Sequence, residues 1–176
     1  MPHFTTTAIQ EAISKLTLPD VSRVWMYTAS RVLSDEETTA LQSHLRDFGA
    51  QWAAHGKALC SESIVILNQI VLLAVDESAQ VATGCSIDAS VNTLKGLENV
   101  MPSMHDVDVF DRSWVLFCNA ESGSWERARL HDFWAMRKAG SLSDDTPIFD
   151  TTQTQLGEVR TAGIKALGDS WHAHMW

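Results

Sequence analysis

The chain has 176 residues, of which 45% are hydrophobic and 20% charged, which is the composition of a globular domain rather than of a disordered or membrane protein. Its formal net charge of -9 argues against non-specific nucleic-acid binding and against attraction to an anionic membrane surface. The three cysteines form no paired motif, which favours a reducing compartment over a disulfide scaffold, so we expect a cytoplasmic protein.

Local patterns predict alternating strands and helices along the chain. Ser34 and Glu37 form a capping box that opens a helix with an apolar stripe. Asn68-Gln69 separates two β-branched runs, which is typical of a hairpin turn. In chain order, the expected elements are a helix over 5–16, a strand over 21–28, a helix over 34–55, strands over 62–67 and 70–75, a helix from about 86 to 102, a strand over 112–119, a helix over 124–140, an extended stretch over 146–150 and a helix over 152–164.

The order β-α-β-β-α-β through residue 119 predicts an α+β, ferredoxin-like antiparallel sheet with two helices on one face. We expect a single domain over 1–176, with a core over 21–119 and a helical, Trp-rich C-terminal extension over 120–176. The run 70–75 is apolar at every position, so both of its faces should be buried. Either the C-terminal extension or a second subunit must cover the face that the helices leave open, and we expect a homo-oligomer, most simply a homodimer.

The segment from Thr83 to Ser90 follows this apolar run and opens an amphipathic stretch, which predicts a corner where strand passes into helix. Cys85 then lies in the positive field of a helix N-terminus, which favours the thiolate and can make the sulfur reactive. The alternative interpretation is a small residue packed where the chain turns. Cys85 is therefore a candidate catalytic residue, as a nucleophile or a redox thiol.

The same corner is a candidate site for a small anionic ligand, such as a carboxylate or phosphate. Free N–H groups near Gly84 and Cys85, the Ser86 hydroxyl and Arg31 from the loop after the first strand would suit an anion. Asp88 opposes an anion or caps the helix, and capping alone accounts for an acid in a first turn. The candidate ligand-binding residues are Arg31, Gly84, Cys85, Ser86 and Asp88.

His55 is the first candidate for a base that would activate Cys85, and topology argues against it. In the predicted fold the first and third strands run parallel, and a helix returns from each, so His55 and Cys85 lie at opposite rims. A helix of about fourteen residues is roughly 20 Å long, far beyond hydrogen-bond reach. His105 fails for the same reason, which leaves a histidine of the C-terminal third as the possible base.

No motif predicts a metal or a cofactor. His172-Ala173-His174 supplies two imidazoles without further ligands at a recognisable spacing, so we expect no metal site. The phosphate-binding loop Gly-x-x-x-x-Gly-Lys-Ser/Thr is absent, and so are the dinucleotide-binding, hydrolase and zinc-protease motifs.

Six segments of the chain belong to one recognisable pattern: Val24-Trp25-Met26-Tyr27, Leu33-Ser34-Asp35-Glu36-Glu37, Gln51-Trp52-Ala53-Ala54-His55-Gly56, Val75-Asp76-Glu77-Ser78, Gly84-Cys85-Ser86-Ile87-Asp88 and Ser170-Trp171-His172. Together they resemble one uncharacterised family of small bacterial proteins that is sometimes labelled "ABC transporter ATPase". The resemblance runs from about Val21 to His172 and implies no activity, ligand or catalytic residue; the missing phosphate-binding loop also conflicts with the label.

Two hypotheses of different classes follow from the sequence. The first is a non-catalytic cytoplasmic α+β protein that binds a small ligand or a partner, without nucleic acid, membrane or cofactor. The second is a thiol-dependent enzyme or redox protein that uses Cys85 at its helix N-terminus.

Overall fold

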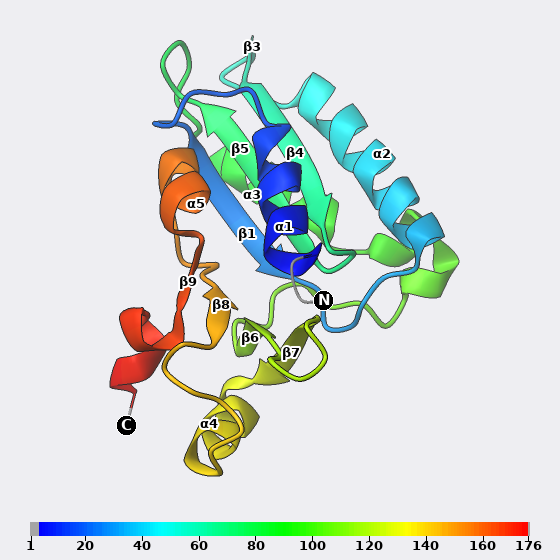
Figure 1. Cartoon of the computed structure of the whole chain (residues 1–176). Helices are drawn as coiled ribbons and strands as arrows, with labels where there is room; N and C mark the ends of the chain where they lie inside the picture. Colours follow the sequence, from blue (N-terminus) through cyan, green and yellow to red (C-terminus); the bar gives the residue numbers. More distant parts are fainter. Residues whose placement is uncertain (1–3, 176) are drawn as a thin grey trace.

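The computed structural model describes residues 4–175; Trp176, one of the C-terminal tryptophans, lies outside the described residues (Figure 1). The strands are β1 (Arg23–Thr28), β2 (Ala53–Ala54), β3 (Lys57–Ala58), β4 (Cys60–Ile66), β5 (Ile70–Asp76), β6 (Trp114–Cys118), β7 (Trp125–Arg129), β8 (Pro147–Phe149) and β9 (Ile164–Ala166). The α-helices are α1 (Phe4–Ser14), α2 (Asp35–Gln51), α3 (Gly84–Leu94), α4 (Leu130–Lys138) and α5 (Leu156–Ala162). Short 3-10 turns are η1 (Leu97–Asn99), η2 (Pro102–Met104), η3 (Leu167–Asp169) and η4 (Trp171–His174). The fold is thus mixed, with helices packed on antiparallel sheets.

The first sheet has three strands in the order β1-β5-β4, and both pairings are antiparallel. β4 and β5 form the hairpin that the sequence predicts, but Ile66 pairs with Ile70, so the loop is the three residues 67–69 and not Asn68-Gln69 alone. Leu67 and Asn68 both take positive φ values, 53° and 56°. Asparagine tolerates that conformation readily, which explains why the chain reverses there.

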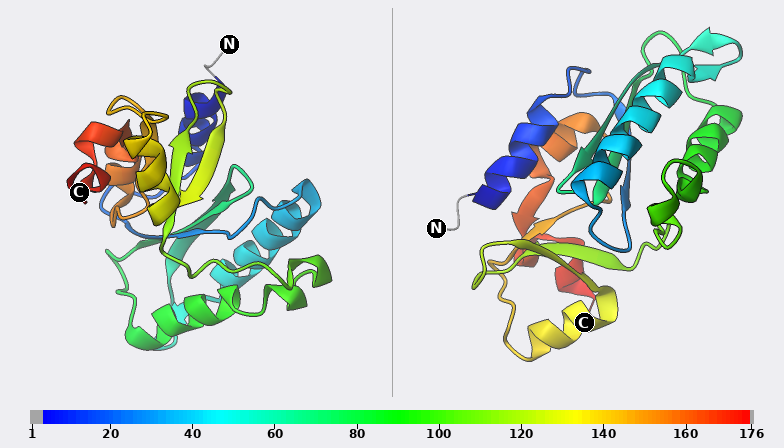
Figure 2. Two further views of the ribbon diagram at one scale, coloured as in Figure 1. Left: turned by 90° about the horizontal axis from the view of Figure 1, so that it is seen from below. Right: turned by 90° about the vertical axis from the view of Figure 1, so that its right-hand side faces the viewer.

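Layers of helix cover both faces of this sheet, as Figures 1 and 2 show. One face packs on α2 and α3 through a buried cluster that includes Leu41, Leu73 and Leu94. The other face packs on α1, α5 and the second sheet through a cluster that includes Ile9 and Leu156. β5 is buried from Ile70 to Val75, so the prediction that both of its faces are covered is confirmed. Because this chain's own elements do the covering, β5 gives no argument for a second subunit.

β4 is an edge strand, and α2 protects it. The side-chain amide of Gln42 on α2 donates to the carbonyl of Ser63 at 3.1 Å and accepts from the N–H of Val65 at 2.9 Å. One amide therefore imitates a neighbouring strand and occupies two backbone groups that would otherwise be free to pair with another chain. The capping box that begins α2 is also as predicted, with Ser34 and Glu37 bonded reciprocally.

The predicted ferredoxin-like order is not found, because the strand at 114–118 does not join the first sheet. β6 pairs instead in a separate four-stranded sheet of order β7-β6-β8-β9. The place beside β1 is taken by a short stretch around Gln155, which forms a bridge with Arg23. The prediction that the first and third strands run parallel is also wrong, since β1 and β5 are antiparallel over their whole length. This orientation decides which loops meet.

The predicted helix over 124–140 is a strand followed by a helix. Trp125–Arg129 pairs with β6 as β7, and α4 begins only at Leu130. The sequence Trp-Glu-Arg-Ala-Arg contains good helix formers, so local propensity favours helix, and the pairing with β6 overrides it. The C-terminal part is therefore a β-sheet layer with α4 and α5 attached, not a purely helical extension.

Candidate functional site

The N-terminus of α3 is built as the sequence predicts, but its serine is already occupied. The Ser86 hydroxyl accepts from the N–H of Thr83 at 2.7 Å and donates to the carbonyl of the same residue at 2.9 Å. Ser86 is buried, whereas Gly84, Cys85 and Asp88 are exposed. The Ser86 side chain thus caps the helix and is not free to hold a ligand.

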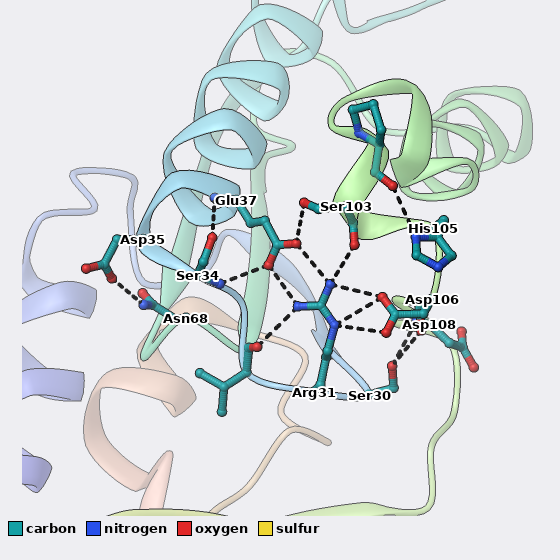
Figure 3. Close-up of polar contacts among 12 residues, drawn as sticks. Ser30, Arg31, Ser34, Asp35, Glu37, Asn68, Ser103, His105, Asp106 and Asp108 are labelled. Carbon is teal, nitrogen blue, oxygen red and sulfur yellow. Dashed lines mark hydrogen bonds and ion pairs between the residues drawn. The ribbon is translucent and has the colours of Figure 1, made fainter.

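Arg31 and Cys85 lie at opposite ends of the first sheet, so the prediction that the two share a rim is wrong. Because β1 is antiparallel to β5, the loop after β1 lies beside the start of β5, whereas α3 follows its end. Arg31 forms an ion pair with Glu37 at 2.8 Å and a second with Asp106 at 3.0 Å (Figure 3). It also donates to the carbonyl of Ser103 at 2.9 Å.

This Arg31 cluster ties the loop after β1 to α2 and to the segment that follows α3. The Arg31 guanidinium and the Ser103 hydroxyl hold the pKa of Glu37 at about 2, well below its ordinary value. The hydrogen bonds from Arg31 lower the pKa of Asp106 as well, and those two carboxylates raise the pKa of Arg31. With both acids engaged, the guanidinium serves packing between loops and is not a free anion receptor.

Cys85 and His55 line the same cavity, of about 280 Å³. The cavity lies between the start of α3 and the β2–β3 hairpin, whose turn places His55 and Gly56 at positive φ values of 51° and 76°. The indole of Trp52 anchors the hairpin by donating to the carbonyl of Ser86 at 2.8 Å. Both Cys85 and His55 are exposed at this cavity.

The prediction that His55 and Cys85 lie at opposite rims is therefore wrong. The first and third strands are antiparallel and not parallel, which brings the end of α2 and the start of α3 to one end of the sheet. His105 does not line this cavity; its Nδ1 lies 3.2 Å from the carbonyl of Pro102, beside the Arg31 cluster.

A second cavity, of about 350 Å³, lies between the two large sheets. Its wall comes from four separate stretches of chain: 24–26 on β1, 112–115 at the start of β6, 151–154 after β8, and Trp171-His172 near the C-terminus. Leu130 and Phe149 also line it. Residues far apart in the sequence thus meet in one cavity whose lining mixes aromatic, aliphatic and polar side chains, and small-molecule sites combine apolar walls with a few polar groups in this way.

Arg112 is the only charged side chain among the described residues that line this inter-sheet cavity. Its Nη1 donates to the carbonyl of Met26 at 3.2 Å, and its guanidinium lies 5.2 Å from the ring centre of Tyr27. Within residues 4–175 no carboxylate lies at ion-pair distance from Arg112. In a chain with a net charge of -9, this wall is locally cationic.

The β1 edge in the cavity carries backbone hydrogen-bonding groups. The N–H of Val24 bonds to the carbonyl of Thr154 on the outer side of β1, at 2.9 Å. In an antiparallel ladder successive residues point their backbone groups alternately to the two sides. Met26, two residues along, therefore also turns its N–H and C=O to the outer edge, where the contact with Arg112 lies.

His172 closes the C-terminal side of the cavity as a neutral imidazole. It is 4% exposed, and burial lowers its pKa to about 4. It stacks on Trp171 with ring centres 3.9 Å apart, and its Nδ1 lies 3.2 Å from the Ser170 hydroxyl. A desolvated titratable group in a cavity is a feature that functional sites share with some structural networks.

The loop at 151–154 is held from behind by Asp150. Its buried carboxylate pairs with Lys165 at 2.8 Å and accepts from Thr152 and Gln153. Burial raises the pKa of Asp150, but the bonds from Lys165 and Thr152 outweigh it and hold the pKa below its ordinary value. The loop that faces the cavity is thus positioned by a paired charge outside the lining.

Sequence reasoning missed the inter-sheet cavity because no motif marks it. Arg112-Ser113-Trp114 at the start of a strand puts a cation next to an aromatic residue, and the C-terminal tryptophans indicate a packing surface. Neither pattern predicts which other residues lie beside these side chains in the fold. The stretches that meet are 24–26, 112–115, 151–154 and 171–172, which only the pairing of the strands brings together.

No known protein family, curated protein or solved structure matches this chain. Over residues 4–175, no group of three or more His, Cys, Asp or Glu side chains is arranged to hold a metal ion. No helix in that range has the length and apolar character needed to cross a bilayer. The geometry of the two cavities is accordingly the basis for any functional conclusion.

Proposed function

We propose that the protein binds a small organic molecule in the inter-sheet cavity and does so without chemically changing it. The observation that carries the proposal is a partly open cavity with aromatic side chains and one cation: Trp114, Phe149 and Trp171 line a space of about 350 Å³ that Arg112 borders. The stretch 151–154 adds four polar side chains to this wall. Aromatic side chains combined with polar groups are typical of small-ligand sites, and this volume falls within their usual range of about 300–1,000 Å³.

The lining supports binding rather than catalysis. The lining contains one cation, Arg112, and one imidazole, His172, whose pKa of about 4 leaves it neutral near pH 7. Neither pairs with a nucleophile in the wall, whereas a general acid or base needs a pKa near the working pH. The lining is therefore better suited to binding a ligand than to catalysing a reaction.

A blocking variant tests the proposal. Thr151 lines the cavity, and its side chain makes no hydrogen bond within the described range. Thr151→Trp should therefore fill the space, and Val81→Trp, on an exposed loop away from it, is the matched control. We expect ligand-observed NMR with benzoate, indole, phenol and nicotinamide to detect at least one bound probe with the wild-type protein and with V81W, but none with T151W.

Two results would contradict the proposal. In the first, none of the probes binds the wild-type protein; in the second, T151W binds them as well as V81W does. Each bound probe should also be recovered unaltered after incubation, since the proposal assigns no reaction to the cavity. A new product that depends on the protein would refute the non-catalytic part alone.

A second candidate function is a thiol reaction at Cys85, and the observation that favours it is the cavity shared with His55. In such a reaction the imidazole would take the thiol proton while the sulfur adds to a carbonyl carbon of the substrate; the C=O π electrons move onto the oxygen, which then takes the proton back from the imidazolium. Cys60 is an exposed free cysteine elsewhere and serves as an internal reference.

Alkylation by iodoacetamide near neutral pH, followed residue by residue with mass spectrometry, tests this candidate. It predicts that Cys85 reacts at least about tenfold faster than Cys60 and that His55→Asn removes the difference. Asparagine is the appropriate replacement because it tolerates the positive φ of 51° at this position. Equal rates at the two cysteines would eliminate the thiol candidate.

We further infer a cytoplasmic location, a homodimer, and membership of the bacterial family that the sequence resembles. Three cysteines without a disulfide among them support a reducing compartment. Trp171 is 41% exposed, and exposed aromatic residues are frequent in interfaces. Light scattering gives the mass of the particle directly, and a mass of one chain at micromolar concentration would remove the dimer.

A further inference from the structure

We propose that the ligand of the inter-sheet cavity is a small aromatic carboxylate, with its carboxylate held by Arg112 and the backbone N–H of Met26. This inference rests on the proposed function and adds the chemical class of the ligand. It is drawn from the charge of the wall, the direction of the β1 edge and the kind of side chain that surrounds the space.

The charge of the wall favours an anion. Arg112 has no carboxylate partner within residues 4–175, although its neighbour Asp111 pairs with Arg129 at 2.6 Å. Asp150, behind the loop at 151–154, is neutralised by Lys165. An anion that enters the cavity therefore meets a cation and no opposing carboxylate in the lining, which is the condition for a favourable ion pair.

The donors at the β1 edge converge. The N–H and C=O of Met26 lie on the same outer side of β1, and the guanidinium of Arg112 is bonded to that C=O at 3.2 Å. The guanidinium consequently stands beside the Met26 N–H. Two donors that meet at one place suit a group that only accepts hydrogen bonds, and an ionised carboxylate is such a group.

A carboxylate fits this donor set better than a phosphate does. Nη1 of Arg112 is engaged with Met26, which leaves the Nε and Nη2 edge for a second partner. That edge presents two parallel N–H groups at the spacing of two carboxylate oxygens. A phosphate group carries up to about two negative charges near neutral pH, and this wall supplies a single cation to balance them.

The rest of the wall favours a flat ring. Trp114, Phe149 and Trp171 line the space, and His172 is stacked on Trp171. Trp25 also lines the space, and its ring packs on Trp52 with ring centres 6.0 Å apart. Aromatic rings bind one another by offset or edge-to-face contacts, so a planar aromatic body gains more here than a puckered ring does.

Calorimetric titration with three probes separates these features. Benzoate carries both ring and charge, benzamide keeps the ring without the charge, and cyclohexanecarboxylate keeps the charge without the flat ring. We expect benzoate to bind at least tenfold more tightly than either of the others. Arg112→Gln should weaken benzoate to the level of benzamide, and Arg112→Lys should recover only part of the loss, because lysine lacks the planar fork.

Arg46→Gln is the matched control, because Arg46 is an exposed arginine of α2 that does not line the cavity. It should leave the binding of all three probes unchanged. Unfolding midpoints of the variants show whether each is folded. As a check that needs no variant, benzoate should move the backbone amide resonance of Met26, and benzamide should move it much less.

The possible results separate this inference from the proposed function. Equal affinity for benzoate and benzamide, or an unchanged benzoate affinity in R112Q, would overturn the carboxylate assignment while binding itself stands. Binding of neutral ring compounds that T151W abolishes, with no benzoate binding at all, would do the same. If no probe of any kind binds, the proposed function fails and this inference fails with it.

Discussion

Glu37→Gln is expected to destabilise the protein although it changes neither size nor shape. Glu37 is 4% exposed and accepts two hydrogen bonds from Arg31, at 2.8 and 2.9 Å. A glutamine in its place can still accept from the N–H of Ser34 and complete the capping box. What it loses is the negative charge that Arg31 and Ser103 stabilise.

The magnitude follows from the pKa of Glu37. Its fall from 4.5 to about 2 corresponds to roughly 3 kcal/mol of preferential stabilisation of the carboxylate, at about 1.4 kcal/mol for each tenfold change in proton affinity. The Arg31 side chain is 32% exposed, so solvent screens part of this energy. Because the folded pKa is the lower one, the stabilisation is complete above about pH 4.5 and is lost as the pH falls toward 2.

Urea unfolding followed by tryptophan fluorescence measures the effect. We expect E37Q to lower the free energy of unfolding by about 2 kcal/mol near pH 7 and by much less near pH 2.5. A double-mutant cycle with Arg31→Gln should show that most of the loss is shared between the two residues. A loss under about 0.5 kcal/mol near neutral pH, or a loss that does not shrink in acid, would refute the reasoning.

Two further predictions concern His172 and the glycines. Since burial lowers the pKa of His172 from 6.5 to about 4, the unfolded chain takes up a proton first, and the unfolding free energy should fall by about 3 kcal/mol as the pH drops from 6.5 to 4. His172→Gln should remove that decline in urea titrations, and an unchanged pH profile would contradict a buried neutral imidazole. A Cβ on Gly157 would lie 2.8 Å from the Cβ of Asp20, so Gly157→Ala should cost about 1–3 kcal/mol. Gly84→Ala meets no atom within 4 Å and should be neutral or slightly stabilising, so equal unfolding midpoints for the two variants would contradict the close approach of α5 to Asp20.

The parts of the fold that local signals determine are predictable from the sequence. The Ser34–Glu37 capping box begins a helix because its partners are three residues apart, and the continuous apolar run over 70–75 predicts a strand buried on both faces. The partner of each strand is a long-range property. β6 is as apolar as a central strand of the first sheet requires, yet it pairs with β7 and β8. Its own residues do not predict which strands it pairs with.

The candidate sites show the same division. A helix start close to Thr83–Ser90 follows from local sequence, whereas Ser86, expected to bind a ligand, caps the helix instead. The neighbours of Cys85 depend on the direction of β1 relative to β5. Parallel strands would place Arg31 near Cys85, whereas the antiparallel strands of the structure place His55 there. The inter-sheet cavity also depends on long-range structure, namely on how the two sheets pack together. The spacing of residues in the sequence therefore does not predict it.

The most direct test of the central claim is the pattern of backbone amide shifts in the NMR spectrum of the protein as benzoate is added. We predict saturable shifts concentrated at the inter-sheet cavity, at Met26, Arg112, Thr151 and Trp171. Amides around His55 and Cys85, which line the other cavity, should stay unmoved. Shifts confined to His55 and Cys85, or no saturable shift anywhere, would contradict the assignment of ligand binding to the inter-sheet cavity.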